Sequence, residues 1–197
     1  MEKKQQWLLT TTLFISLGLA ACGSQSVLSQ AEAQTQTTTK TATTSNTQDA
    51  TYFEASDLTV TYDESKASKI SLQGTTATAS GEGVTVNGST VEITKAGTYI
   101  VEGTATSVQL KVAAGKEDEV QIVFKNAALK NTEAPLLVDS AKKVILTLAD
   151  GTKNEVVDES ASTVKGAIYS DSDLTINGKG SLTVTGAASN AIKSKDG

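Results

Sequence analysis

From Tyr52 onward, apolar and polar residues alternate with a period of two rather than 3.6. Short runs of Val, Ile and Leu alternate with Thr, Gln, Glu or Lys, and Gly, Asn or Asp residues bound each run. The runs are 58–62, 84–86, 91–93, 108–112, 120–124, 144–148, 174–176 and 182–184. No segment of ten residues carries a helical stripe with capping residues. The pattern therefore predicts an all-β fold built from short strands.

Two repeats in the C-terminal part predict how these strands are arranged. Residues 174–178 (Leu-Thr-Ile-Asn-Gly) recur as residues 182–186 (Leu-Thr-Val-Thr-Gly), eight residues later. Residues 167–170 (Ala-Ile-Tyr-Ser) recur as residues 191–194 (Ala-Ile-Lys-Ser), 24 residues later. Three short strands fit one such period. The spacing predicts a solenoid of triangular coils, in which strands of successive coils pair in parallel and like side chains stack.

Upstream of these repeats the frame has two solutions. Val120, Val144, Ile168 and Ile192 fall 24 residues apart, which continues the same period. In the other solution, residues 144–146 align with residues 174–176 at a spacing of 30. Residues 152–165 would then form a bulged loop between coils.

The alternative architecture is an antiparallel β-sandwich, which uses similar short strands but does not require the 24-residue spacing. We favour the solenoid for the C-terminal half. Residues 52–97 show no clear repeat and are expected to form an entry cap or a small layer of strands. Residues 194–197 begin a further coil, so the chain is expected to be the front part of a longer protein. Left-handed backbone at bends is expected at the following glycines: Gly103, Gly178, Gly180 and Gly186.

Residues 1–21 have the features of a secretory leader. Lys3 and Lys4 precede an apolar stretch that is too short and too rich in Thr and Ser for a membrane-spanning helix. Two alanines then precede Cys22, the one cysteine of the chain, in an arrangement similar to the lipobox of bacterial lipoproteins. That resemblance implies cleavage before Cys22 and a diacylglyceryl anchor on its sulfur, which would hold the protein on the extracytoplasmic face of the cell membrane. The alternative is an ordinary signal peptide beside an unrelated cysteine.

Residues 22–50 consist largely of Ser, Thr, Gln and Ala. Such a segment has almost no apolar side chains to bury, so ordering it would cost conformational entropy without compensation. We expect a disordered tether between the lipid anchor and a single folded domain over residues 51–197.

The composition excludes several classes of site. All 17 basic residues are lysines, and there is no histidine and one cysteine. Ser-His-Asp and Cys-His catalysis, zinc sites built from His and Cys, and disulfides are therefore impossible. The net charge of −5 and a pI of about 4.8 argue against a nucleic-acid partner.

Residues 97–104, 167–186 and 191–196 resemble the secreted, often lipid-anchored bacterial carbohydrate-binding β-helix proteins. The characterised member of that family binds pectic acid and cellulose, and its fold is similar to that of calcium-dependent pectate lyases. The resemblance covers about residues 51–197. It implies a right-handed parallel β-helix with bound Ca²⁺ that binds acidic polysaccharide without cleaving it.

Three acidic residues are candidate metal ligands. Asp171 and Asp173 are two residues apart, so both carboxylates project to one side of an extended segment. Asp196 lies about one coil further, opposite Ser172 in the 24-residue frame. Three carboxylates at one edge would repel one another without a cation, and Ca²⁺ accepts six to eight oxygen ligands. Backbone carbonyls and hydroxyls of Ser170, Ser172 and Ser194 could complete its shell. The alternative is a solvated row of polar bend residues.

Lysines near the repeat are candidate ligand-binding residues. Lys193 and Lys195 follow the second Ala-Ile unit and project to the same side, and Tyr169 offers a ring with a polar tip. A uronate carboxylate bridged by Ca²⁺, with a lysine beside it, would reconcile an acidic protein with an acidic ligand. The alternative is a set of solvated lysines that protect sheet edges from aggregation, a role also open to Lys142, Lys143 and Lys179.

Three functions follow from these patterns. The first is a noncatalytic surface lipoprotein that binds polysaccharide. The second is a solenoid scaffold or adhesin with a protein partner. The third is a polysaccharide lyase, which needs a strong base next to the substrate. Because arginine is absent, only a lysine with a lowered pKa could supply that base.

Overall fold

A computed structural model describes residues 53–159, 166–187 and 190–195 of the chain. The predicted leader (1–21), Cys22 and the whole of the tether (22–50) lie outside the described residues, as does Asp196. Within the described part the fold is all-β, with one short 3₁₀ turn, η2 (Ala55–Leu58). No described helix is long and apolar enough to cross a membrane.

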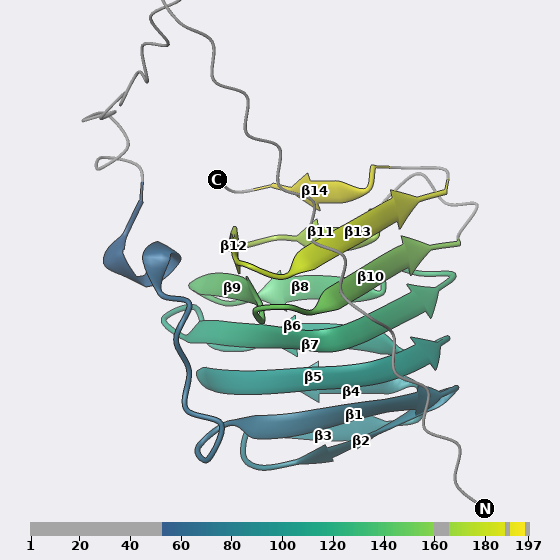
Figure 1. The fold of residues 1–197 in the computed structure, drawn as a ribbon, viewed down its shortest axis with the longest axis horizontal. Coiled ribbons are helices and arrows are strands. Elements are labelled where there is room, and N and C mark those ends of the chain that lie inside the picture. Colours follow the sequence, from purple (N-terminus) through teal and green to yellow (C-terminus); the bar gives the residue numbers. More distant parts are fainter. Residues whose placement is uncertain (1–52, 160–165, 188–189, 196–197) are drawn as a thin grey trace, which may run out of the picture. The chain divides into compact units, whose positions relative to one another are not determined.

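The strands form two sheets (Figure 1). The eight-stranded sheet contains β1 (Ser68–Gly74), β2 (Thr76–Ser80), β5 (Gly97–Thr106), β7 (Glu119–Asn131), β9 (Lys143–Leu148), β10 (Lys153–Asp158), β12 (Asp173–Gly178) and β13 (Ser181–Gly186). The six-stranded sheet contains β3 (Val84–Asn87), β4 (Thr90–Ile93), β6 (Gln109–Ala113), β8 (Leu136–Ser140), β11 (Ile168–Ser170) and β14 (Ile192–Ser194).

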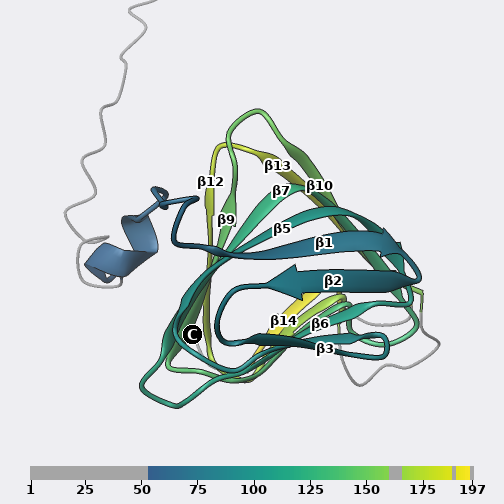
Figure 2. The same ribbon diagram turned by 90° about the horizontal axis from the view of Figure 1, so that it is seen from below.

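Together the sheets make a parallel β-solenoid of about four turns. In the two later coils, each coil has three strands: β9, β10 and β11, then β12, β13 and β14. In the coil before these two, the single long strand β7 covers two sides of the triangle. Its first half pairs with β9 and its second half pairs with β10. Seen along the axis in Figure 2, the coils superimpose on three sides. The predicted solenoid is confirmed.

The register confirms the repeat at residues 167–194 and decides between the two upstream frames. Ile168 pairs with Ile192 and Tyr169 with Lys193, so the 24-residue repeat is one coil. Val144 pairs with Leu174, at a spacing of 30. The continuous 24-residue frame from Val144 to Ile168 is therefore wrong. The expected bulged loop over 152–165 is also wrong in part, because residues 153–158 form β10 and pair with both β7 and β13.

The first strands close the N-terminal end of the solenoid. β1 pairs with β2 and β3 pairs with β4 in antiparallel hairpins, whereas the other pairings are parallel. The two hairpins lie together at one end of the stack, opposite the end that holds β14 (Figure 1). This arrangement is the entry cap that the missing repeat in residues 52–97 indicated.

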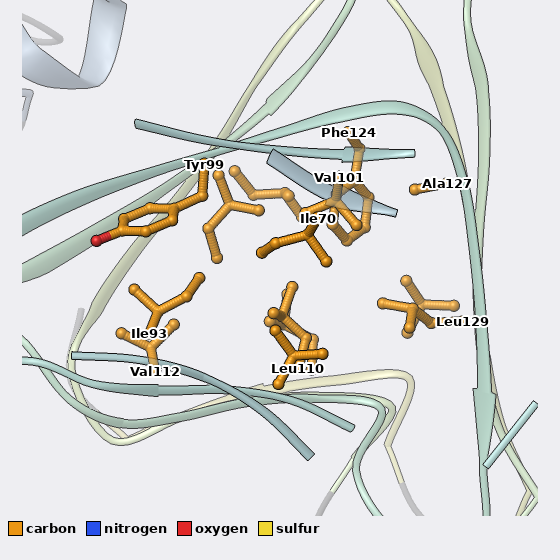
Figure 3. Close-up of a cluster of buried hydrophobic side chains, with 14 of the residues drawn as sticks. Ile70, Ile93, Tyr99, Val101, Leu110, Val112, Phe124, Ala127 and Leu129 are labelled. Carbon is orange, nitrogen blue, oxygen red and sulfur yellow. The ribbon is translucent and has the colours of Figure 1, made fainter. Parts of the chain in front are cut away.

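The core fills the space between the sheets with stacked rows of aliphatic side chains. One row is Ile70, Val101, Phe124 and Leu148, which are register partners on β1, β5, β7 and β9 and are all buried. Figure 3 shows this side of the core opposite Ile93, Leu110 and Val112 of the six-stranded sheet. Each coil covers the apolar side chains of the previous one, so the stack forms one continuous core.

The bend between the two sides of the eight-stranded sheet needs unusual backbone. Positive φ is found there at Gly103 (94°), Asn126 (57°) and Gly178 (100°). The sequence also predicted left-handed backbone at Gly180, but that residue does not have positive φ. Buried Asn154 joins three coils at this bend, because its Oδ1 accepts from the backbone N–H of Ala127 (2.9 Å) and its Nδ2 donates to the carbonyl of Ser181 (3.1 Å).

Residues 53–67, which we call the strap, lie outside the core against the eight-stranded sheet. They begin beside β12 and end at the start of β1, so they run along the stack across several coils (Figure 1). The strap includes η2.

Candidate functional site

The outer face of the six-stranded sheet carries a row of polar and aromatic side chains. Along each strand the outward residues alternate with core residues, as between Lys111 and its neighbours Leu110 and Val112. Parallel register then stacks the outward residues of successive coils. The row is Glu92, Lys111, Leu137, Tyr169 and Lys193.

Tyr169 is the centre of the cluster that the sequence predicted for ligand binding. The ammonium nitrogens of Lys195 and Lys193 lie 5.5 Å and 6.0 Å from the centre of its ring. The phenol donates a hydrogen bond of 3.0 Å to Oδ1 of Asp171. We call Tyr169, Asp171, Lys193 and Lys195 the Tyr169 cluster. The structure therefore brings both predicted lysines close to one aromatic ring.

Asp171 and Lys195 form an ion pair with an Nζ–Oδ1 distance of 2.7 Å. The pairing follows from the ladder, because the backbone N–H of Lys195 donates to the carbonyl of Ser170 and places residue 195 above residue 171. The hydrogen bond to Asp171 and the interaction with Tyr169 raise the pKa of Lys195 above its ordinary value. Lys195 is therefore fully charged at neutral pH, and more than half of its side chain is exposed.

The ring of Tyr169 packs on Ala134 and Leu137 and is only 4% exposed. A buried ring supports the aliphatic parts of the two lysines but offers little surface on which a sugar could stack. Contact with a ligand at this cluster would therefore run through the lysine ammonium groups. Tyr99, the other tyrosine of the paired strands, is buried in the core and donates to the carbonyl of Lys95 (2.8 Å).

A polar cavity of about 400 Å³ adjoins the cluster. The carboxylates of Asp139, Asp171 and Asp173 contribute to its lining, as do Lys116 and Lys142. Asp171 and Asp173 both line this cavity. Asp139 was not identified from the sequence. It lies near the end of β8, Asp171 directly follows β11, and the pairing of these two strands puts the two positions one coil apart.

The oxygen chemistry of this cavity suits a hard cation such as Ca²⁺, but the carboxylates are only partly available. Asp171 is already paired with Lys195, and Asp139 lies 3.5 Å from Lys111. Among the described residues no group of three or more acidic side chains is arranged to hold a metal ion. Asp196 lies outside the described residues, so its predicted contribution is not tested.

Two of the hydroxyls expected to complete a calcium shell have other roles. Ser170 is fully buried, and its hydroxyl donates to the carbonyl of Ser172 (2.6 Å). The hydroxyl of Ser172 accepts from the backbone N–H of Ala141 (3.0 Å), which ties β12 to the previous coil. Ser170 therefore belongs to the fold and cannot also coordinate a cation at the surface.

Comparisons with known proteins agree with the fold. Residues 87–197, which include the whole outward row, match a family described as carbohydrate-binding domain-containing protein. A protein of that description from Acetivibrio thermocellus is 38% identical over 120 residues. A solved structure, described as the polysaccharide lyase-like protein from C. thermocellum in a gadolinium derivative, shares the fold with a TM-score of 0.57 and 35% identity.

The aligned regions are partial on both sides. They cover 56% of this chain and 42% of the A. thermocellus protein, and 63% of this chain and 54% of the solved structure. The chain thus spans about half the length of the relatives that it matches.

Proposed function

This chain belongs to the family of carbohydrate-binding domain-containing proteins, and from this we propose that it binds an acidic polysaccharide, without cleaving it, on the outer face of the six-stranded sheet. The observation that carries the proposal is the Tyr169 cluster. It presents two ammonium groups on one side of a rigid parallel ladder, within the region that matches the family. A polygalacturonate-like chain carries the repeated carboxylates that such a surface would hold.

The local charge supports an acidic ligand even though the whole chain is acidic. Lys195 is paired with Asp171, which lines the adjoining cavity, and Lys116 and Lys142 add positive charge to the same cavity. These ammonium groups can each interact with a carboxylate through charge-assisted hydrogen bonds. The net charge of −5 is spread over the rest of the sequence and does not prevent local attraction at a Debye length of about 8 Å.

We further propose that Ca²⁺ assists binding at the cavity beside the cluster. Asp171 and Asp173 would supply protein carboxylates there, and the sequence adds Asp196 as a third candidate. The missing ligands would come from the polysaccharide carboxylate and from water, which Ca²⁺ accepts readily. Binding would then depend on calcium because protein and ligand each hold only part of the coordination shell.

The electrostatics of the lysines support a noncatalytic role. A lyase base must lose its proton near neutral pH, which requires a lowered lysine pKa when arginine is absent. Hydrogen bonds to carboxylates instead raise the pKa values of the following lysines: Lys111, Lys125, Lys142 and Lys195. These groups hold their protons more tightly than free lysine, so they are suited to binding anions.

We also propose that the protein works at the cell surface. Residues 1–21 would direct export, Cys22 would carry the lipid, and residues 22–50 would let the solenoid reach polysaccharide beyond the bilayer. These segments lie outside the described residues, and the proposal rests on their sequence alone.

Replacing both cluster lysines in Lys193→Ala/Lys195→Ala is expected to weaken binding of polygalacturonate by about tenfold or more, because two charge-assisted contacts are lost. The dissociation constant of the full chain, measured by calorimetry in the presence of Ca²⁺, checks this. The matched control is Lys66→Ala/Lys95→Ala, which removes the same charge from two exposed lysines elsewhere. An equal loss in the control would show that only net charge matters.

The same preparations separate the competing functions. Retention of polygalacturonate that falls when a chelator removes Ca²⁺ supports the calcium-assisted site. If the full chain retains no polysaccharide from a broad panel in either condition, a scaffold with a protein partner becomes the better explanation. Formation of an unsaturated product that absorbs ultraviolet light would show that the protein is a lyase.

A further inference from the structure

The first part of the strap binds the eight-stranded sheet through a buried carboxylate. Asp57 is 5% exposed, and its carboxylate accepts hydrogen bonds from Nζ of Lys143 (3.0 Å) and from the hydroxyl of Thr175. Glu54 lies 3.1 Å from the same ammonium group. Lys143, which the sequence suggested as a solvated edge lysine, is thus 6% exposed and covered by the strap.

The groups that hold Asp57 come from two neighbouring strands. Lys143 begins β9, and Thr175 and Asn177 lie on β12, which pairs with β9 in parallel. Asn177 donates from Nδ2 to the backbone carbonyls of Asp57 and Thr59, both at 3.0 Å. These three side chains are positioned by the solenoid itself, because the ladder between β9 and β12 does not involve the strap.

The three side chains together can bind a carboxylate that has further oxygen atoms close to it. An ammonium and a hydroxyl hold the carboxylate, and an amide donates to nearby oxygen atoms. Oδ1 of Asn177 is buried and has no hydrogen-bond partner in the described part of the chain, so it is a spare acceptor for a hydroxyl group. A uronate residue offers both a carboxylate and hydroxyls in close proximity.

Asp57 occupies this set as an anion. Burial alone would raise the pKa of its carboxyl, but the hydrogen bonds from Thr175 and Lys143 outweigh that effect and hold the pKa below its ordinary value. The position therefore favours a negatively charged group over a neutral one.

The lower part of the strap is attached separately. Tyr62 and Ala67 pack against the outward apolar side chains Ile100, Val123 and Ala149, and Glu64 pairs with Lys125 at 2.8 Å. The segment around Asp57 can therefore leave the sheet while the rest of the strap stays bound. Its release would expose Lys143, Thr175 and Asn177 to solvent.

We propose that Lys143, Thr175 and Asn177 form a second site for the carboxylate of an acidic polysaccharide, and that Asp57 occupies this site as an internal competitor. The inference takes its ligand class from the proposed function, but the site lies on the other sheet and shares no residue with the Tyr169 cluster. Ligand and strap then compete, so occupation of the site displaces the segment that leads towards residues 1–52.

The test uses the full chain in the Lys193→Ala/Lys195→Ala background, in which the Tyr169 cluster is silenced. Adding Asp57→Asn removes the competing charge while keeping the size of the side chain. We expect its affinity for trigalacturonate to rise by about tenfold over the background. The amide signals of residues 143, 175 and 177 should shift on titration in a nuclear magnetic resonance spectrum, and a further Lys143→Met change should abolish the gain.

The matched control is Asp63→Asn, which makes the same charge change in the strap at a side chain that bonds only Ser65 and Lys66. An equal gain in this control, a gain that survives Lys143→Met, or a folded Asp57→Asn protein with unchanged affinity would overturn the inference. If Asp57→Asn does not fold, Glu54→Gln weakens the same clamp and should give a smaller gain of the same kind, and its failure to do so would also overturn it.

Failure of the proposed function has a different signature. In that case the unmodified chain does not bind polygalacturonate, whereas the response of residues 143, 175 and 177 to trigalacturonate in Asp57→Asn still decides whether the second site exists.

Discussion

Replacing Phe124 with alanine is expected to lower the free energy of unfolding by about 3–5 kcal/mol. Phe124 is fully buried and lies in the middle of the stacked row of Ile70, Val101 and Leu148, with a coil on either side (Figure 3). The surrounding backbone is fixed by two parallel ladders, so it cannot collapse into the space that the ring leaves. Chemical denaturation followed by circular dichroism measures the change.

Phe53→Ala is the matched control, because it removes the same ring from a position that is 53% exposed. Its effect should stay within about 0.5 kcal/mol, as for other surface substitutions. Comparable losses for both variants would mean that the stacked row does not carry the stability of the solenoid.

Gly103→Ala is expected to cost about 2–5 kcal/mol, through backbone strain at positive φ and a direct clash. A Cβ at this position would meet the carbonyl oxygen of Leu72, its register partner on the neighbouring coil. Both β1 and β7 pair with β5 here, so the strand cannot move away from the clash. The free energy of unfolding from urea titration checks the expected loss.

Gly88→Ala separates the two causes. Gly88 also has positive φ, but a Cβ there would meet no atom within 4 Å. It should show the backbone strain without the clash, and hence a clearly smaller loss. Equal losses at both glycines would contradict the close approach of coils at Gly103.

The solenoid could be predicted because the sequence patterns that specify it are short and repeat at a regular spacing. Alternation sends Leu110 inward and Lys111 outward, and the Ala-Ile-x-Ser unit marks one coil. The strand over residues 153–158 escaped detection because polar Asn154 and Asp158 occupy two of its three buried positions. In this fold a buried Asn can be satisfied by backbone groups of adjacent coils, as the hydrogen bond to Ala127 shows, so hydrophobic alternation is not required of every strand.

The candidate sites differ in how far sequence reasoning could reach them. Lys193 and Lys195 were found because alternation alone puts them on one side. The ion pair between Asp171 and Lys195 follows only once the coil register is known. The contact between Asp57 and Lys143 joins residues 86 positions apart, and no repeat or motif marks it. The strap therefore had no signal in the sequence, and Lys143 resembled an ordinary surface lysine.

The outer faces of the two sheets differ in whether their polar side chains are open to solvent or covered by the strap. In the Tyr169 cluster on the six-stranded sheet Lys195 is exposed and Lys193 half-buried, whereas the strap covers Lys143 of β9 on the eight-stranded sheet. A parallel solenoid permits this difference because its core is formed from inward side chains alone, and outward side chains are left for binding.

The proposed binding face is tested most directly by titrating the ¹⁵N-labelled full chain with trigalacturonate in the presence of Ca²⁺ and mapping the amide shifts. The largest shifts are expected on the outer row of the six-stranded sheet, at residues 169, 171, 193 and 195, with smaller ones at 111 and 139. Shifts confined to other surfaces, or no saturable shifts at millimolar ligand, would contradict polysaccharide binding at this face.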